Sequence, residues 1–281
     1  MNHPTSWPAP AKLNLFLHIT GRRADGYHLL QSVFQFLDYG DEITITVRRD
    51  GEIHRTSELS GVRPEQDLVV RAARLLQQYS HTSLGADIHV RKVLPMGGGL
   101  GGGSSDAATV LVALNQQWQC GLSLDALAEI GLQLGADVPV FVHGHAAWAE
   151  GVGEILVPVE LPEPWFLVIT PPVEVSTAEI FSDPRLTREC QAIKIRDFLA
   201  GEGENVCQPV AASHYPEIAQ ALTWLGQFAK AKMTGTGSCI FAAFDTEAQA
   251  QQVYQQLPEQ WNGFVARANN RSALHRRLAE F

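Results

Sequence analysis

The sequence predicts an α+β protein built from two domains. Its length of 281 residues fits two domains or one large domain, with ample chain for a hydrophobic core. Prolines are densest between residues 158 and 172, and we place a boundary there, giving domains of residues 1–160 and 161–281. Beyond the boundary, helical and strand-like hydrophobic patterns alternate, which is typical of helices covering one face of an antiparallel sheet.

The composition is that of a globular protein, with 45% hydrophobic and 18% charged residues. A formal net charge of −9 argues against nucleic-acid binding through a general basic surface. No apolar run approaches the roughly 20 residues of a membrane helix, and the N-terminal segment lacks the apolar stretch of a signal peptide. We therefore expect a cytoplasmic monomer or weak homodimer that binds neither nucleic acid nor membrane.

The residue types that commonly bind metals are not arranged as a metal site. His143 and His145 would share one face of a short strand, but no third ligand is near, so we favour a turn around Gly144. The scattered cysteines, which lack any Cys-x-x-Cys spacing, predict buried free thiols rather than disulfides or a zinc site: Cys120, Cys190, Cys207 and Cys239.

Residues 9–19 are predicted to form the first strand. Leucine or isoleucine takes every odd position from 13 to 19, so the even positions form a second, partly polar face that carries Lys12 and Asn14. These two side chains therefore point the same way, and a solvated strand edge is the ordinary explanation for such a lysine. Residues 21–28 follow as a glycine-punctuated loop that ends in a Tyr-His pair.

The next hydrophobic patterns alternate between strand and helix. Alternating β-branched residues predict a strand at residues 43–47, and apolar spacings of three and four predict a helix at residues 67–79. Strand-like alternation returns at residues 86–94, immediately before the most unusual stretch of the chain.

That stretch, residues 95–106, reads Pro-Met-Gly-Gly-Gly-Leu-Gly-Gly-Gly-Ser-Ser-Asp. A glycine inside a helix or strand costs roughly 0.5 to 1 kcal/mol relative to alanine, so this run serves something other than local stability. A strand precedes it, and helical spacing follows from Ala107 to Trp118, with Ser104 or Ser105 as the expected N-cap. Bare backbone N–H groups at a helix N-terminus form a cradle for phosphate.

Other interpretations of the glycine run fit less well. A flexible linker lacks flanking periodicity, and a Walker A loop needs a lysine that this run does not contain. A dinucleotide loop needs an acidic residue at a strand end about twenty positions on, whereas Asp125 falls at a helix start. We therefore predict a nucleotide-phosphate loop. An acidic protein must gather cations beside it, from Lys12, Arg22, Arg23, Arg91, Lys92 or Mg²⁺.

Asp137 is the best candidate for a general base. A helix is predicted at residues 124–134, with Ser123 as its N-cap and a left-handed Gly135 at its end. Residues 140–143 are strand-like, so Asp137 lies at a helix-to-strand corner in a rigid, otherwise apolar neighbourhood. A simple turn-former before a proline is the ordinary alternative.

The second domain should contain a second glycine-hydroxyl loop, Thr-Gly-Thr-Gly-Ser at residues 234–238, for which an ordinary turn is the alternative. The periodic segments around it predict strands at residues 165–170, 240–244 and 264–268 and helices at residues 216–228 and 246–257.

Residues 10–15 (Pro-Ala-Lys-Leu-Asn-Leu), 95–106 and 234–238 resemble, in order and separation, the three motifs of the GHMP small-molecule kinases. Arg-Ala-Asp-Gly-Tyr-His at residues 23–28 and Gly-Ala-Asp-Val-Pro at residues 135–139 resemble the branch that acts on a cytidine-diphosphate-linked alcohol. The resemblance covers nearly the whole chain and is weakest from residue 185 to 216.

This resemblance implies an N-terminal domain like the second domain of ribosomal protein S5, a ferredoxin-like C-terminal domain, and an active site in the cleft between them. It implies transfer of a phosphoryl group from ATP, with Mg²⁺, to the 2-hydroxyl of 4-diphosphocytidyl-2-C-methyl-D-erythritol in the non-mevalonate route to isoprenoids. Other branches, acting on homoserine or mevalonate-like alcohols, remain the alternative, as does a nucleotide-binding domain without catalysis.

The resemblance also implies roles for individual residues. Asp137 becomes the base and Lys12 its cationic partner. The acceptor substrate would be bound by Asn14, Tyr27, His28 and Phe181, with the two aromatic rings stacked on the cytosine and the histidine at its hydrogen-bonding edge. The ATP phosphates would be held by Pro95, Met96, Gly97, Gly98, Gly99, Leu100, Gly101, Gly102, Gly103, Ser104 and Ser105. At Asp67 relatives more often carry asparagine, which puts the adenine contact of this position in doubt.

Overall fold

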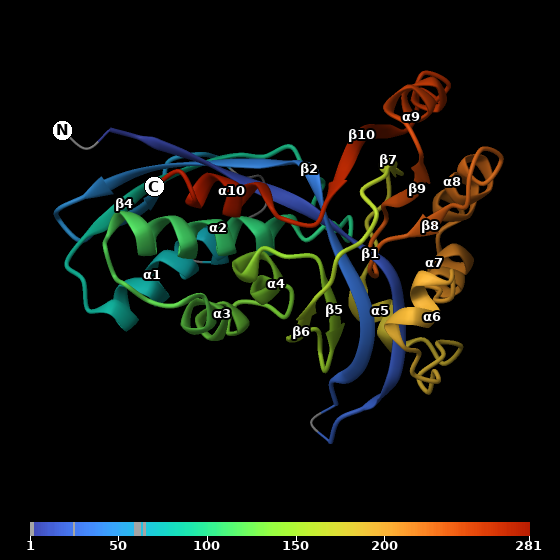
Figure 1. The fold of residues 1–281 in the computed structure, drawn as a ribbon, viewed down its shortest axis with the longest axis horizontal. Helices are drawn as coiled ribbons and strands as arrows, with labels where there is room; N and C mark the ends of the chain where they lie inside the picture. Colours follow the sequence, from blue (N-terminus) through green and yellow to red (C-terminus); the bar gives the residue numbers. More distant parts are fainter. Residues whose placement is uncertain (1–2, 25, 59–62, 64–65) are drawn as a thin grey trace.

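The computed structural model describes residues 3–24, 26–58, 63 and 66–281, and it confirms the α+β class (Figure 1). Among these residues, strands join in a sheet of order β3-β4-β2-β10-β7-β9-β8, in which β1 and β5 also pair with β2, and β6 pairs with β5. The strands are β1 Thr5–Arg22, β2 His28–Arg48, β3 Ile53–Arg55, β4 Gly85–Arg91, β5 Ala147–Glu150, β6 Ile155–Pro158, β7 Trp165–Thr170, β8 Lys232–Met233, β9 Ile240–Phe244 and β10 Asn262–Asn269. The helices are α1 Leu68–Ser80, α2 Gly102–Gln117, α3 Leu124–Leu132, α4 Val138–His143, α5 Thr177–Ser182, α6 Ile195–Leu199, α7 Gln208–His214, α8 Pro216–Leu225, α9 Glu247–Tyr254 and α10 Ala273–Leu278.

The long antiparallel pair β1 and β2 runs across the molecule (Figure 1). Strands β1 to β6 form the first sheet and β7 to β10 the second, and the two are joined where β10 pairs with β2. Lys12 and Asn14 of β1 are buried, so the expected solvated strand edge is wrong. The β1–β2 register shifts between Pro10 and Lys12, where the Lys12 N–H instead donates to the carbonyl of Leu100 in the glycine loop, at 3.0 Å. This irregularity ties the first strand directly to the predicted phosphate loop.

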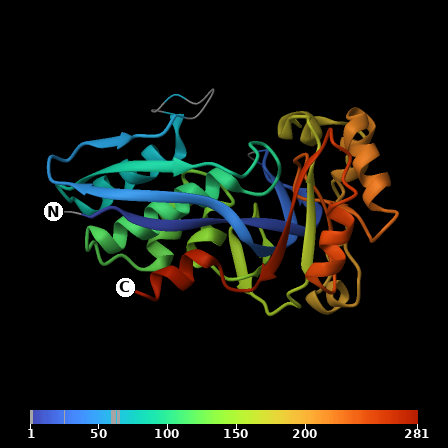
Figure 2. The same cartoon turned by 90° about the horizontal axis from the view of Figure 1, so that it is seen from above.

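Helices α1 to α4 pack together and against the first sheet, and their apolar faces form its core with Trp7, Phe34 and Phe36 (Figure 2). The spacing predicted for α2 is correct, but its expected serine N-cap is wrong. The helix begins within the glycine run, at Gly101 with φ of 73°. The Ser105 hydroxyl donates instead to the Pro10 carbonyl, at 2.7 Å.

The predicted strand at residues 140–143 is also wrong, because residues 138–143 form helix α4. A short apolar run fits a strand or a buried helix equally well by periodicity, and here Pro139 begins a helix whose side chains pack on α2 and α3. The turn at Gly144 is confirmed, with φ of 67°, so His143 and His145 share no strand face. Gly135 is not left-handed; α3 ends two residues earlier than predicted, at Leu132, with a right-handed Gln133 as its C-cap.

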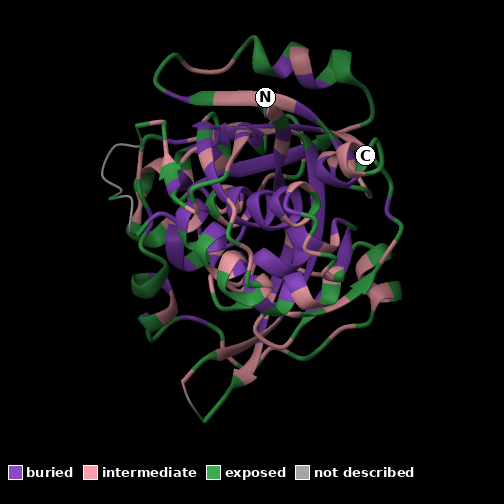
Figure 3. Cartoon of the chain, turned by 90° about the vertical axis from the view of Figure 1, so that its left-hand side faces the viewer, coloured by how far each residue is buried: buried purple, intermediate pink, exposed green. Residues whose placement is uncertain are grey.

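The C-terminal strands pair only antiparallel with one another, as predicted. Leu167 and Ile169 on β7 belong to a core that includes residues of helices α5, α7 and α8. Phe166 and Val168, on the opposite face of β7, share a core with Leu13 of β1. Strand β10 pairs with β2 as well as with β7, and α10 returns to pack on β1. Buried residues consequently run through the middle of the molecule, while the outward faces of the surrounding helices are exposed (Figure 3).

Candidate active site

Two cavities meet beside Asp137. The first, of about 850 Å³, is lined by residues from β1, the turn after it and α5. The second, of about 480 Å³, is lined by the glycine loop and the start of α1. Both are lined by the same four residues at their junction: Gly99, Asp137, Thr177 and Thr236. A molecule in one cavity can therefore reach a molecule in the other at this point.

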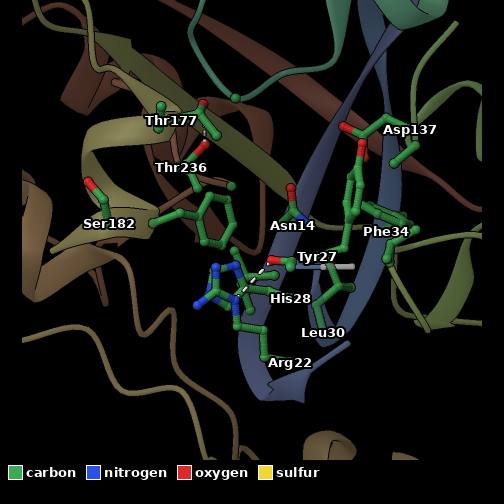
Figure 4. A pocket seen from close by; sticks show the side chains of 18 of the residues that line it. Asn14, Arg22, Tyr27, His28, Leu30, Phe34, Asp137, Thr177, Ser182 and Thr236 are labelled. Carbon is green, nitrogen blue, oxygen red and sulfur yellow. Dashed lines mark hydrogen bonds between the residues drawn. The ribbon is translucent and has the colours of Figure 1, made fainter. Parts of the chain in front are cut away.

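Lys12 and Asp137 form an ion pair at the junction, with Lys12 Nζ 3.2 Å from Asp137 Oδ2. Asp137 is the N-cap of α4 but makes no capping bond, which leaves its carboxylate directed to the lysine and the cavity (Figure 4). The lysine is buried, whereas 35% of the aspartate side chain is exposed. Both residues line the first cavity, and the carboxylate is the more exposed of the two groups.

Asn14 and the third motif hold this pair against the glycine loop. Lys12 Nζ donates to Asn14 Oδ1 at 2.5 Å and to the Gly99 carbonyl at 3.1 Å. The Asn14 N–H donates to the hydroxyl of Thr234, which in turn donates to the Gly99 carbonyl at 3.2 Å. All three motifs thus converge on Gly99, so the motifs that are far apart in the sequence build one site.

The glycine run is needed for close approach and for its backbone conformation. Gly97, Gly99 and Gly101 all have positive φ, between 70° and 78°. A Cβ at Gly99 would lie 2.1 Å from the Thr234 carbonyl oxygen, and a Cβ at Gly237 would lie 2.2 Å from the Gly99 nitrogen. The run leads into the N-terminus of α2, where unpaired N–H groups and the helix dipole attract anions.

A charged cluster beneath the loop was only partly anticipated. Lys92 was one of the cations expected here, and its Nζ lies 2.6 Å from Asp41 Oδ2 and 2.7 Å from Asp106 Oδ2. Burial and the Asp41 charge raise the pKa of Asp106 to about 7, although Lys92 opposes this. Burial alone would lower the pKa of Lys92, but the two carboxylates outweigh it and leave that pKa raised. Nothing in the sequence pattern brings Asp41 to this place.

Asp67 lines the second cavity and is the N-cap of α1, accepting from the Val69 N–H at 2.9 Å. Its other oxygen pairs with the Arg55 guanidinium, and both side chains are only 6% exposed. The aspartate at this position is therefore matched by an arginine, a pairing that an asparagine would weaken. No sequence pattern points to this arginine, because it lies on a separate short strand, β3.

Tyr27, His28 and Phe181 line the first cavity (Figure 4 labels the first two). The His28 ring stacks on Phe181 with ring centres 5.0 Å apart, and the Tyr27 ring is 65% exposed. Burial, and then the nearby Arg188 and Arg22, lower the pKa of His28, which favours the neutral ring. The Nε2 atom of His28 is buried and has no hydrogen-bond partner among the described residues. Asp25, from the same Arg-Ala-Asp-Gly-Tyr-His motif, lies outside the described residues.

The junction offers oxygen atoms rather than a preformed metal cage. No group of three or more His, Cys, Asp or Glu that could hold a metal occurs among the described residues. Mg²⁺ in kinases is commonly held by one or two carboxylates together with substrate phosphates, and Asp137 with the Thr177 and Thr236 hydroxyls fits that donor type. In the part of the chain that the structure describes, no helix has the length and apolarity to span a bilayer.

Family patterns match both halves of the chain. The GHMP kinases N terminal domain matches residues 67–145, and the GHMP kinases C terminal domain matches residues 189–263. A solved structure of a homoserine kinase from Cytophaga hutchinsonii is 16% identical with a TM-score of 0.69, over 96% of each chain, and shares the fold.

Two more similar relatives share the name 4-diphosphocytidyl-2-C-methyl-D-erythritol kinase. That of Nitrosococcus oceani is 61% identical over 95% of this chain and 96% of its own length, and that of Pseudomonas syringae pathovar syringae is 60% identical over 96% of each. A solved structure of 4-(cytidine 5'-diphospho)-2C-methyl-D-erythritol kinase has a TM-score of 0.83 and 28% identity, covering 94% of this chain and 99% of the other. The chain belongs to the 4-diphosphocytidyl-2-C-methyl-D-erythritol kinase branch of the GHMP kinases, which are ATP-dependent small-molecule kinases.

Proposed function

We propose that this protein transfers the γ-phosphoryl group of ATP to the 2-hydroxyl of 4-diphosphocytidyl-2-C-methyl-D-erythritol, giving the 2-phosphate and ADP. The observation that carries the proposal is the meeting of two cavities at the Lys12–Asp137 pair. The glycine-lined cavity suits the triphosphate, and the cavity lined by Tyr27, His28 and Phe181 suits a cytidine-containing alcohol. The names of the relatives supply the substrate.

Phosphoryl transfer requires positioning and charge stabilisation more than covalent help from the protein. In our proposal the backbone N–H groups of residues 97–104 hold the phosphates, and Asp137 accepts the proton of the attacking hydroxyl. Ser105 does not take part, because it is buried and its N–H donates to the Gly101 carbonyl at 2.8 Å. Lys12, 3.2 Å from that carboxylate, offsets the negative charge that develops during transfer. Mg²⁺ bound with ATP would neutralise charge on the phosphate oxygens.

The aromatic half of the first cavity supplies the proposed specificity. Cytosine would stack between Tyr27 and Phe181, so the His28 ring, which stacks on Phe181 in the structure, would move toward the edge of the base. The unpartnered Nε2 of His28 supports this placement, because a buried ring nitrogen without a partner is stabilised by a ligand that provides one. Asn14 lies next to the acceptor hydroxyl in the proposed complex, through its bond to Lys12.

The proposal is tested by measuring ATP turnover with the cytidine-linked substrate and with a panel of simple alcohols, including homoserine and mevalonate. We expect kcat/KM to be highest by orders of magnitude for the cytidine-linked substrate, because the simple alcohols leave the aromatic rings unfilled. Preference for any acceptor without cytosine overturns the assignment. Absence of turnover with every acceptor, with ATP still bound, favours a domain that binds nucleotides without catalysis.

Three further statements stay predictions from the sequence and the family. These are a boundary between the two domains near residue 160, a cytoplasmic location, and a monomer or weak homodimer that binds no nucleic acid. The assignment of the reaction depends on none of them.

A further inference from the structure

Helix α5 carries Phe181 of the proposed acceptor site and Thr177 of the junction, but it is too short to hold itself in place. It spans Thr177–Ser182 and brings Thr177 and Phe181 to the first cavity. A helix of this length is unstable alone in water, so its position depends on contacts with the rest of the protein. One such contact is apolar, through the fully buried Ile180. Thr177 Oγ1 also lies 2.8 Å from Thr236 Oγ1, and the Phe181 carbonyl accepts a bond from Arg188 at 2.8 Å. A further set of polar contacts comes from the end of α7.

His214, the last residue of α7, contacts a carboxylate at each end of α5. Its Nδ1 lies 3.3 Å from Glu179 Oε1, in the first turn of α5, and its Nε2 lies 2.5 Å from Asp183 Oδ2, directly after the helix. Tyr215, the next residue, donates its hydroxyl to Glu179 Oε2 at 2.5 Å. The ring of His214 therefore bridges both ends of α5 to a separate element of the fold.

The bridge is distinct from the local pairing of Asp183. Arg185 also donates to both oxygens of Asp183, and together with His214 it lowers the pKa of that aspartate. Arg185 stands two residues away in the same segment, and its guanidinium reaches α7 only at His214 Nε2, 2.8 Å away, among the described contacts. Loss of His214 consequently leaves the buried Asp183 charge paired but removes its link to α7, and such a variant should still fold.

We propose that His214 is a positioning residue for the acceptor site. By holding Glu179 and Asp183, it fixes the orientation of α5 and so places Phe181 for stacking against the base of the acceptor. Neither His214 nor its partners line the glycine-lined cavity. The role rests on the function proposed above, since it concerns the binding of that acceptor.

The test combines kinetics with hydrogen exchange of the full-length protein. We expect His214→Ala to raise KM for the cytidine-linked substrate about tenfold, the effect of losing roughly 1.4 kcal/mol of positioning. KM for ATP should rise less than KM for the acceptor, because Thr177 is the one residue of α5 that also lines the glycine-lined cavity. Backbone amides of residues 177–182 should exchange faster, because α5 loses its link to α7 at Asp183 and one of its two links at Glu179, where Tyr215 remains.

Two conservative variants show which end matters. His214→Gln keeps a donor near the position of Nε2 and should restore the contact with Asp183, and His214→Asn keeps one near Nδ1 and should restore the contact with Glu179. At least one of these two variants should have a KM for the acceptor close to that of the wild-type protein. The matched control is His54→Ala, since His54 also lies beside a carboxylate, 3.4 Å from Asp87, but lines neither cavity.

Unchanged exchange at residues 177–182 overturns the proposal, because α5 would then be held without His214. Faster exchange with an unchanged KM for the acceptor also overturns it, since the bridge would then be only structural. If the wild-type protein does not phosphorylate the cytidine-linked substrate, the proposed function is overturned instead. Hydrogen exchange at residues 177–182, measured without substrate, would still show whether His214 holds α5.

Discussion

The two cavities that meet at Asp137 are built from different parts of the chain. The glycine-lined cavity is made mostly of backbone, positioned by close approach of Gly99 and Gly237. The other is made of side chains from separate elements, among them Tyr27, His28 and Phe181. A backbone site binds what all nucleoside triphosphates share, and a side-chain site distinguishes one acceptor from another. The difference predicts that mutations on each side will have separable kinetic effects.

The largest effect is expected at the junction, which belongs to both cavities. Asp137→Asn should lower kcat by roughly 10² to 10⁴-fold, the usual contribution of a general base, while ATP affinity stays near normal. Single-turnover kinetics with ATP titration measures both quantities. Asp125→Asn is the control, because Asp125 is an exposed residue in the first turn of α3. Near wild-type turnover of Asp137→Asn would falsify the base assignment.

The next effect separates backbone crowding from backbone strain on the ATP side. Gly97 and Gly99 both have positive φ, but a Cβ at Gly97 meets nothing within 4 Å, whereas one at Gly99 meets the Thr234 carbonyl. Gly97→Ala should cost about 1 to 2 kcal/mol of unfolding free energy, from strain alone. Gly99→Ala should cost more and should lower kcat/KM for ATP by about 100-fold, since the loop must shift.

Thermal unfolding and ATP kinetics of the two alanine variants, measured side by side, test this prediction. Equal losses in both would mean that strain, rather than the contact with Thr234, makes glycine necessary at position 99. A selective rise in KM for the acceptor would contradict the assignment of the loop to ATP.

A smaller effect is expected on the acceptor side. Tyr27→Ala should raise KM for the cytidine-linked substrate about tenfold, because stacking of a base on an aromatic ring contributes roughly 1 to 3 kcal/mol. KM for ATP should not change. Tyr27→Phe keeps the ring and should behave like wild type in the same steady-state assay. If Tyr27→Ala leaves KM for the acceptor unchanged, the base binds elsewhere.

The smallest effect concerns the charges beneath the glycine loop. The pKa of Asp106 is about 7 in the folded protein, above the value of about 3.9 for an unfolded aspartate. The stabilisation from protonated Asp106 is therefore complete below about pH 4 and is lost as the pH rises to about 7. Asp106→Asn does not titrate, so its melting temperature relative to wild type should increase between pH 5 and pH 8. Calorimetry over that range measures the trend, and a constant difference contradicts it.

The sequence predicted most reliably what a single segment determines. Strands β7 and β9 have the predicted bounds, since each is a short apolar run with clear turn signals around it. The strand predicted at residues 140–143 was wrong, because this run of Val, Pro and Phe forms helix α4 by packing on α2 and α3. The glycine loop could be interpreted as a phosphate site from local pattern alone.

Side-chain arrangements across elements were a different matter. The Lys92 cluster and the Arg55–Asp67 pair join residues that are 12 to 65 positions apart in the sequence. Hydrophobic periodicity describes neighbours within one element and cannot predict contacts between such residues. Phe181 entered only through resemblance to the family. Tyr27 was noticed in the loop as part of a Tyr-His pair, but its role came from the resemblance, and both roles stay predictions. The helix that carries Phe181 lies in a segment too short for a hydrophobic period to stand out.

Strand β1 also limits how the two halves can move and melt. Trp7 and Ala9 belong to the core beside α2, Leu13 to the core between the sheets, and Leu17 and Ile19 to the core of the C-terminal half. A hinge between the halves would have to bend this strand against its long ladder with β2. The two cavities should therefore close on their substrates through movement of loops and α5 rather than by rotation of one half over the other. Because β1 belongs to all three cores, loss of any one of them should unfold both halves in one cooperative event.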